Sequence, residues 1–165
     1  MAHTGEARAA LLRRYEQGTA LLTAALAEVP AEALHWRPAP GKWSVHEVIV
    51  HCADSETNSA MRIRYLVGET RPAIQGYDQD RWAREMRYEA LPLELSLAQV
   101  TTVRAWTGAF LRTLGDAAWE REGTHSEMPG EPYAALKWLE IYAEHLEIHA
   151  RQIRRNLAAW RASGH

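Results

Sequence analysis

Apolar side chains recur along most of this chain at spacings of three and four residues, and this period most limits the folds open to it. Because an α-helix turns once every 3.6 residues, the spacing predicts amphipathic helices. No segment alternates convincingly between apolar and polar residues, so we expect no strand, and no internal repeat is visible. The sequence therefore predicts an all-α fold.

Four segments carry this helical period, and turn residues separate them. The expected helices span residues 6–29, 44–67, 96–114 and 136–160. The second has the clearest start, because Ser44 and Glu47 form an S-x-x-E capping box, and Trp43 and Val48 can pack around it as a hydrophobic staple. Ser96 is placed to cap the third helix. Four helices of about 20 residues predict a four-helix bundle.

The second and third predicted helices are far apart in the sequence. The segment from Glu69 to Pro92 has no sustained apolar period and contains Pro, Gly and many charges, so we expect a long connection with a short helix around residues 80–87. Connections of this length usually have a function or are loosely ordered. With 165 residues, the chain fits one domain over residues 1–165.

Composition excludes several classes of function. The net charge is only −2, and the Arg residues alternate with acidic ones instead of clustering, so nucleic acid is not an expected partner. Cys52 is the only cysteine, which rules out an intramolecular disulfide and a cysteine-based zinc cluster. Neither a secretory signal nor an apolar run long enough to cross a membrane is present, so we predict a cytoplasmic protein without a membrane partner.

Three histidines are expected on inward faces of two predicted helices. His145 and His149 lie four residues apart in the fourth helix, on the same stripe as Leu139 and Tyr142. His51 lies on the inward stripe of the second helix. Bundle cores commonly contain metal sites built from facing helices, and neutral imidazole is a good transition-metal ligand. We therefore predict that these three histidines bind one divalent metal ion.

Other interpretations of the histidines remain open. An H-x-x-x-H pair alone also fits surface histidines or hydrogen-bonded core histidines, and the third inward histidine is what favours a metal. The metalloprotease motif H-E-x-x-H is excluded, because H-L-E-I-H places Glu147 about 200° around the helix from His145. The Glu-x-x-His pairs of a di-iron bundle are absent. Four other histidines are expected at the surface or the termini, without a role: His3, His35, His46 and His165.

Three protein ligands would leave one coordination position open, as in catalytic sites. Tyr142 and Gln152 are expected beside the histidines, and the long connection is expected to supply pocket walls, for which the candidates are Tyr77, Asp80 and Trp82. Glu47 could serve as a base, but the capping box already accounts for it. Cys52 is expected to be a small buried hydrophobe. Three aromatic residues at helical spacing are expected in the core or an interface: Trp106, Trp138 and Trp160.

Two motifs resemble the metal-bearing helices of the DinB/YfiT-like metalloenzyme family, in its YfiT-type branch. They are PAPGKWSVHEVIVH (residues 38–51) and YAEHLEIHARQI (residues 142–153). Between them, RPAIQGYDQDRWA, LPLELSL and WEREGTHSEMPGEPYAALKWL are similar to that branch in order and spacing. The resemblance implies a DinB/YfiT-like four-helix bundle with a long connection between helices two and three. It also implies that His51, His145 and His149 are the metal ligands.

The resemblance further implies one zinc or nickel ion per chain, a homodimer and a small-molecule substrate. Some members of the family transfer low-molecular-weight thiols such as bacillithiol or mycothiol, and others are described as metal-dependent hydrolases. The chain departs from the branch at Ile148 and Gln152, where further histidines are common. The leading hypothesis is thus an enzyme that activates water or a thiol cosubstrate. The alternative is a non-catalytic, metal-stabilised ligand-binding or interaction module, which a fourth protein ligand would favour.

Overall fold

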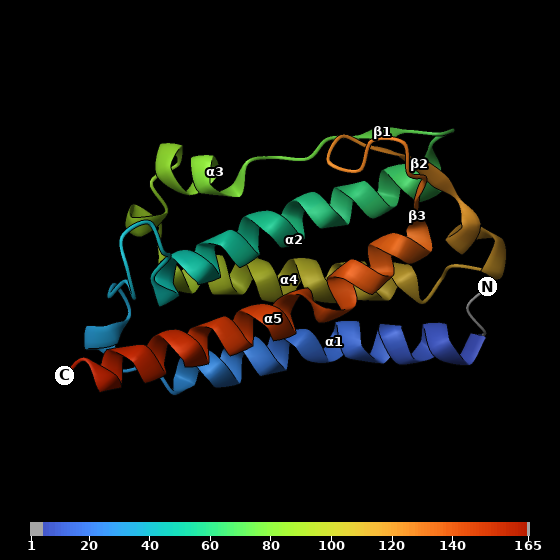
Figure 1. The fold of residues 1–165 in the computed structure, drawn as a ribbon. Helices are drawn as coiled ribbons and strands as arrows, with labels where there is room; N and C mark the ends of the chain where they lie inside the picture. Colours follow the sequence, from blue (N-terminus) through green and yellow to red (C-terminus); the bar gives the residue numbers. More distant parts are fainter. Residues whose placement is uncertain (1–4, 165) are drawn as a thin grey trace.

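A computed structural model describes residues 5–164, and four long helices form an elongated bundle (Figure 1). They are α1 (Gly5–Ala27), α2 (Val45–Gly68), α4 (Leu93–Leu111) and α5 (Ala135–Ala162). Between α2 and α4 the chain forms the short helix α3 (Gln79–Glu85). One-turn 3₁₀ segments cover Ala31–Ala33 and Tyr88–Ala90, and a longer one covers Asp116–Glu120. The predicted bundle and its long connection are confirmed. Two of the histidines considered above, His3 and His165, lie outside the described residues.

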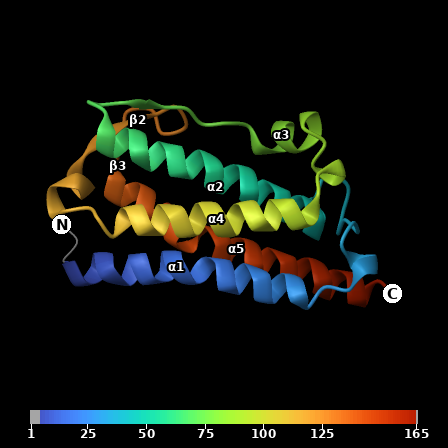
Figure 2. The same cartoon turned by 180° about the vertical axis from the view of Figure 1, so that it is seen from behind.

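The bundle has an unusual order of helix directions. Figure 1 and Figure 2 show α1 and α5 running one way along the bundle and α2 and α4 running the opposite way. The most extensive packing is between α1 and α5 and between α2 and α4. Because α2 and α4 are parallel neighbours, the chain must return along the whole length of α2 before α4 begins. The length of the connection between them follows from this topology.

A small sheet joins the two long connections, so the expectation that the chain has no strand is wrong. Strand β2 (Glu122–His125) pairs in parallel with β1 (Ala73–Ile74) and antiparallel with β3 (Tyr133–Ala134). The sheet lies over the C-terminal end of α2 (Figure 1). Gly123 is required there, because a side chain on it would clash with the Pro72 carbonyl oxygen. Strands of two to four residues are too short to show a two-residue period in the sequence.

Helix starts were predicted with mixed success. The capping box of α2 is present: the Glu47 backbone N–H donates to Ser44 Oγ (3.2 Å), and the Ser44 backbone N–H donates to Glu47 Oε2 (2.8 Å). Ser96 is not the cap of α4, which begins three residues earlier. The Ser96 hydroxyl instead donates to the Pro92 carbonyl within the first turn (2.9 Å).

Two apolar clusters fill the space between the four long helices, and a smaller third cluster lies where α3 packs on α2. The core contains large, fully buried side chains from α1, α2, α4 and α5: Tyr15, Leu22, Ile49, Ile63, Leu111, Trp138, Leu139, Leu146 and Ile153. Trp138 is therefore in the core as predicted, whereas Trp106 is 55% exposed and is not a core residue. Trp160 is half-buried. Within residues 5–164, no helix is long and apolar enough to cross a membrane.

Candidate metal centre

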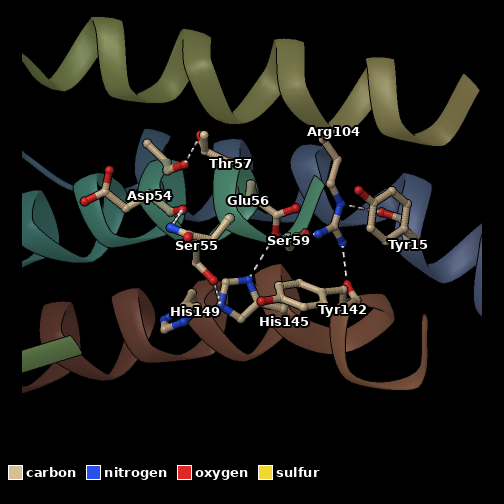
Figure 3. Close-up of polar contacts among 12 residues, drawn as sticks. Tyr15, Asp54, Ser55, Glu56, Thr57, Ser59, Arg104, Tyr142, His145 and His149 are labelled. Atoms are coloured by element: carbon tan, nitrogen blue, oxygen red, sulfur yellow. Dashed lines mark hydrogen bonds and ion pairs between the residues drawn. The ribbon is translucent and has the colours of Figure 1, made fainter. Parts of the chain in front are cut away.

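Helices α2 and α5 bring the three predicted histidines together. One candidate ligand atom from each of His51, His145 and His149 lies within 4.8 Å of the other two. The ring centroids of the three imidazoles are 4.7 to 5.7 Å apart. Figure 3 shows His145 and His149 rising from α5 toward α2. His145 and His149 thus share one face of α5, as their spacing predicted, and this face is turned toward the helix that carries His51.

Burial keeps two of these imidazoles neutral. It lowers the pKa of His51 to about 2, with a further contribution from the neighbouring His149 and His145. Burial and the nearby His145 lower the pKa of His149 to about 4. His51 Nδ1 is buried and has no hydrogen-bond partner among the described residues. A neutral imidazole with an unpartnered nitrogen beside two others has a free lone pair for a metal ion.

Neighbouring side chains orient the two histidines of α5. His149 Nδ1 contacts Gln152 Oε1 (2.9 Å), and His145 Nδ1 contacts Glu56 Oε1 (3.0 Å). Metal-binding histidines commonly donate their second ring nitrogen to an oxygen in this way, which fixes the tautomer and leaves Nε2 for the ion. Ser55 Oγ lies 3.2 Å from His145 Nε2. Gln152 therefore lies beside the three-histidine cluster.

A buried ion pair supports this arrangement from behind. Arg104 Nη1 donates to Glu56 Oε1 over 2.6 Å, and both side chains are at most 2% exposed (Figure 3). Burial acts to raise the pKa of Glu56, but Arg104 and the contact with His145 outweigh it and keep this pKa below its usual value. Arg104 also donates to the backbone carbonyls of Tyr15 (3.1 Å) and Tyr142 (2.7 Å). One guanidinium from α4 thus connects to α1, α2 and α5.

Sequence reasoning missed Glu56 and Arg104. The available signal was a charged residue on an otherwise inward stripe, since Glu56 follows Cys52 by one helical turn and Arg104 follows Val100 by one turn. Such a stripe shows that a charge is buried. It does not show which helix supplies the partner.

A cavity of about 180 Å³ adjoins the histidines. Its lining includes His145 and several other polar side chains, among them Ser55, Arg62, Tyr77, His125 and Tyr142. Tyr77 and Tyr142 therefore line this cavity. Trp82 stacks on the ring of Tyr77, with centroids 4.2 Å apart, and is not part of the lining. Asp80 is exposed and lines a separate cavity of about 650 Å³ beside Trp43 and Glu47.

The remaining histidines give one correction and one omission. His46 is buried, with Nε2 2.7 Å from the Leu91 carbonyl oxygen, so its expected surface position is wrong. Its position on α2 places it off the face that carries His51, but the 3₁₀ segment Tyr88–Ala90 covers it. His35 is exposed as predicted. His125 received no role from the sequence, because only the pairing of β2 with β1 brings it to the cavity.

Glu47 and Cys52 carry groups that could react, but each has a structural role that explains its position. The Glu47 carboxylate pairs with Arg37 and accepts from the Ser44 backbone, as the capping box predicted. Cys52 is fully buried, and burial raises the pKa of its thiol well above the usual value. The prediction that it is a small buried hydrophobe is confirmed. We assign neither residue a chemical role.

The donor set fits one divalent transition metal ion. It consists of imidazole nitrogens, which suit zinc, nickel, copper and iron, and two of the three rings are already oriented by oxygen acceptors. Among the residues that the structure describes, no Cys, Asp or Glu joins the three histidines in one cluster. If all three bound one ion, they would leave a coordination position for water or a substrate atom. Fold and site together define a helical bundle with a candidate mononuclear metal centre.

Comparison with known families agrees with this class. The model of the DinB superfamily matches residues 14–153, so the chain belongs to the DinB superfamily. The family resemblance inferred from the two histidine motifs is thereby confirmed.

Similar proteins carry names that refer to metal-dependent hydrolysis. A "Putative metal-dependent hydrolase" of Oceanobacillus iheyensis is 34% identical over 68% of this chain, but the match spans only 64% of that protein. One of Bacillus licheniformis is 30% identical over 86% of this chain and 82% of its own length.

Two solved structures have a similar fold. YfiT from Bacillus subtilis, described as a "probable metal-dependent hydrolase with an unusual four-helix bundle topology", superposes with a TM-score of 0.85. It is 26% identical, covering 94% of this chain and 88% of its own. A mycothiol-dependent maleylpyruvate isomerase has a TM-score of 0.71 at 18% identity, covering 88% of this chain and 60% of its own. At that identity the likeness concerns the fold alone.

Proposed function

We propose that this protein is a metal-dependent enzyme that uses a three-histidine centre to activate water or a low-molecular-weight thiol. The observation that carries the proposal is the convergence of His51, His145 and His149 beside a cavity, with no fourth protein donor among residues 5–164. The names of the curated relatives support metal-dependent hydrolysis. The fold shared with a mycothiol-dependent isomerase makes thiol transfer the second form of the same proposal.

We propose that the three imidazoles hold one zinc or nickel ion per chain, because neutral nitrogen ligands suit both metals. Bound there, the ion would supply Lewis acidity, which lowers the pKa of a water molecule or thiol at the open position. Glu56 and Gln152 would keep His145 and His149 in the tautomer that presents Nε2.

The cavity residues would position the reacting group. The Ser55 hydroxyl lies 3.2 Å from His145 Nε2, so it is placed to form a hydrogen bond with a nucleophile held at the histidines. Burial raises the pKa of Tyr77 to about 12 and also raises that of Tyr142. Both phenols therefore remain protonated at neutral pH and act as hydrogen-bond donors or acceptors, not as bases. Because the Cys52 thiol is fully buried, any thiol used in catalysis must come from outside the chain.

An activity panel tests the proposal. Metal-loaded and metal-stripped protein would be incubated with esters, amides and electrophiles, each with and without bacillithiol or mycothiol. We expect turnover only in the metal-loaded protein, because activation of the nucleophile depends on the ion. Turnover without thiol identifies a hydrolase, and turnover that requires thiol identifies a transferase. If neither form of turnover occurs, and refolded His51→Ala protein still binds ligand, the enzyme proposal is rejected in favour of a non-catalytic module.

We also propose that the chain forms a homodimer. The family resemblance supports this assembly, and so does Trp106, a large aromatic side chain that is 55% exposed on α4, since such residues are enriched at interfaces. Light scattering should give a mass of about twice the 18.7 kDa of one chain. A mass of one chain across a range of concentrations would reject the dimer. A single domain, a cytoplasmic location and the lack of a nucleic-acid partner stay predictions from the sequence.

A further inference from the structure

Arg62 is a buried cation without a buried counter-ion. It lies on α2 beside the cavity next to His145, and it is 9% exposed. Its guanidinium donates to the Tyr142 hydroxyl (Nη1, 3.3 Å) and to the Gln75 carbonyl (Nη2, 2.8 Å). Among residues 5–164, no carboxylate oxygen lies within 4.0 Å of it, whereas Arg104, which is 2% exposed, is paired with Glu56. Buried charges are normally paired, so this cation calls for an anion from elsewhere.

Other groups on the cavity wall are also hydrogen-bond donors. The Tyr77 hydroxyl is buried and makes no well-formed hydrogen bond with the described residues. His125 Nδ1 accepts the backbone N–H of Glu127 (3.2 Å), so the proton of its neutral ring is on Nε2. The carboxylate that lines the cavity belongs to Glu127, whose side chain is 58% exposed, so water screens its charge. The buried part of the wall is therefore rich in donors and carries a positive charge.

The guanidinium is held in place before any ligand arrives. Gln75, whose carbonyl accepts from Arg62, directly follows strand β1, and the next residue, Gly76, donates its backbone N–H to Ser126 Oγ (2.8 Å). The pairing of Ile74 with His125 fixes this loop to β2. These two hydrogen bonds use one donor each of Nη1 and Nη2, so the other N–H groups of the guanidinium are left for a ligand.

We propose that this cavity binds a carboxylate group of the reacting small molecule, with Arg62 as the main contact. The inference rests on the proposed function of the three histidines, because His145 lines the same cavity and a ligand anchored there would reach them. A planar carboxylate matches the fork of a guanidinium, and a volume of about 180 Å³ suits a small acid. The carboxylate could belong to the thiol cosubstrate or to the electrophile or ester that is attacked. The shared chemistry is the same in both cases.

The test compares probes that differ only in charge, with metal-loaded protein and calorimetric binding as the readout. N-acetylcysteine and its amide represent the thiol source, and a 4-nitrophenyl hemisuccinate ester and 4-nitrophenyl butyrate represent the other source, read by binding or by hydrolysis. We expect wild-type protein to prefer the carboxylate member of at least one pair. Arg62→Met should weaken that member by about 10- to 100-fold, the effect of losing a charged hydrogen bond, and should leave the neutral member nearly unchanged. The pair that responds identifies the source.

The matched control is Arg64→Met, because Arg64 lies on the same helix but stacks on Trp106 (3.4 Å to the ring centroid) away from the cavity. Arg62→Lys keeps the charge without the fork, and it should lose less affinity than Arg62→Met. Metal content of each variant shows whether the centre and the fold are intact. Variants of His51, His145 and His149 test the metal site separately. If they keep their metal while Arg62 is still needed for the preference for the charged probe, the proposed metal function fails and the carboxylate site stands.

Two results would overturn the carboxylate site. In the first, wild-type protein binds the charged and the neutral probe equally. In the second, Arg62→Met keeps the preference for the charged probe. If that retained preference is then lost when the metal is removed, the carboxylate binds the ion directly.

Discussion

Replacing His149 with alanine is expected to remove nearly all of the metal that the purified protein carries. Wild-type protein should contain about one transition-metal ion per chain by elemental analysis, because one three-histidine set is present among the described residues. Metal at 100 times its Kd stabilises a folded protein by about 2.7 kcal/mol, which corresponds to a rise in Tm of about 5 to 10 °C at this size. The Tm of the variant should not respond to added metal.

The choice of control for this experiment follows from the structure. His46 is buried and bonded to the Leu91 carbonyl, so its replacement would disturb the fold for reasons unrelated to metal. His35 is exposed and outside the cluster, so His35→Ala should keep full metal content and the full Tm response. His145→Ala should behave like His149→Ala. Full occupancy in both cluster variants would contradict the assignment of the ligands.

Arg104→Met is expected to cause a large loss of stability. The change leaves the fully buried Glu56 carboxylate without its cation, and breaking a buried pair in this way costs about 3 to 5 kcal/mol. It also removes the side-chain donor that Arg104 provides to the backbone carbonyls of Tyr15 and Tyr142. Urea unfolding of the wild-type protein and the variant would measure the difference in the free energy of unfolding.

A matched control is available at the C-terminal end of α4. Arg112, also on the α4 side of the bundle, pairs with Glu16 at the surface, and its side chain is 65% exposed. Exposed pairs contribute about 0 to 1 kcal/mol, so Arg112→Met should change little. If Arg104→Met and Arg112→Met unfold at the same urea concentration, the buried pair does not stabilise the fold as described.

The sequence predicted features that depend on neighbouring residues along one helix. The capping box of Ser44 and Glu47, and the common face of His145 and His149, depend on separations of three or four residues, so a local pattern is sufficient. Ser96 shows where a local pattern misleads, because α4 already begins at Leu93 and the Ser96 hydroxyl bonds to the Pro92 carbonyl inside its first turn.

Features that depend on which segments meet in space could not be predicted in the same way. Tyr77 and Asp80 are three residues apart, yet they face different cavities, because the chain turns into α3 between them. His125 reaches the cavity only through the pairing of Ile74 with His125 across two connections. The inward charges Glu56 and Arg62 are visible as breaks in an apolar stripe, but their partners come from α4, α5 and a loop.

The side-by-side packing of α1 and α5 has a consequence for synthesis on the ribosome. Helix α1 emerges first, but the helix that covers its buried residues, including Leu22, emerges last. The nascent chain must therefore keep the apolar stripe of α1 unpaired, or covered by a chaperone, until α5 has been synthesised. Since α5 also carries His145 and His149, the same late event completes the histidine cluster. We expect metal uptake to follow synthesis of α5, so a ribosome-bound chain halted before α5 should show neither protease resistance nor bound metal.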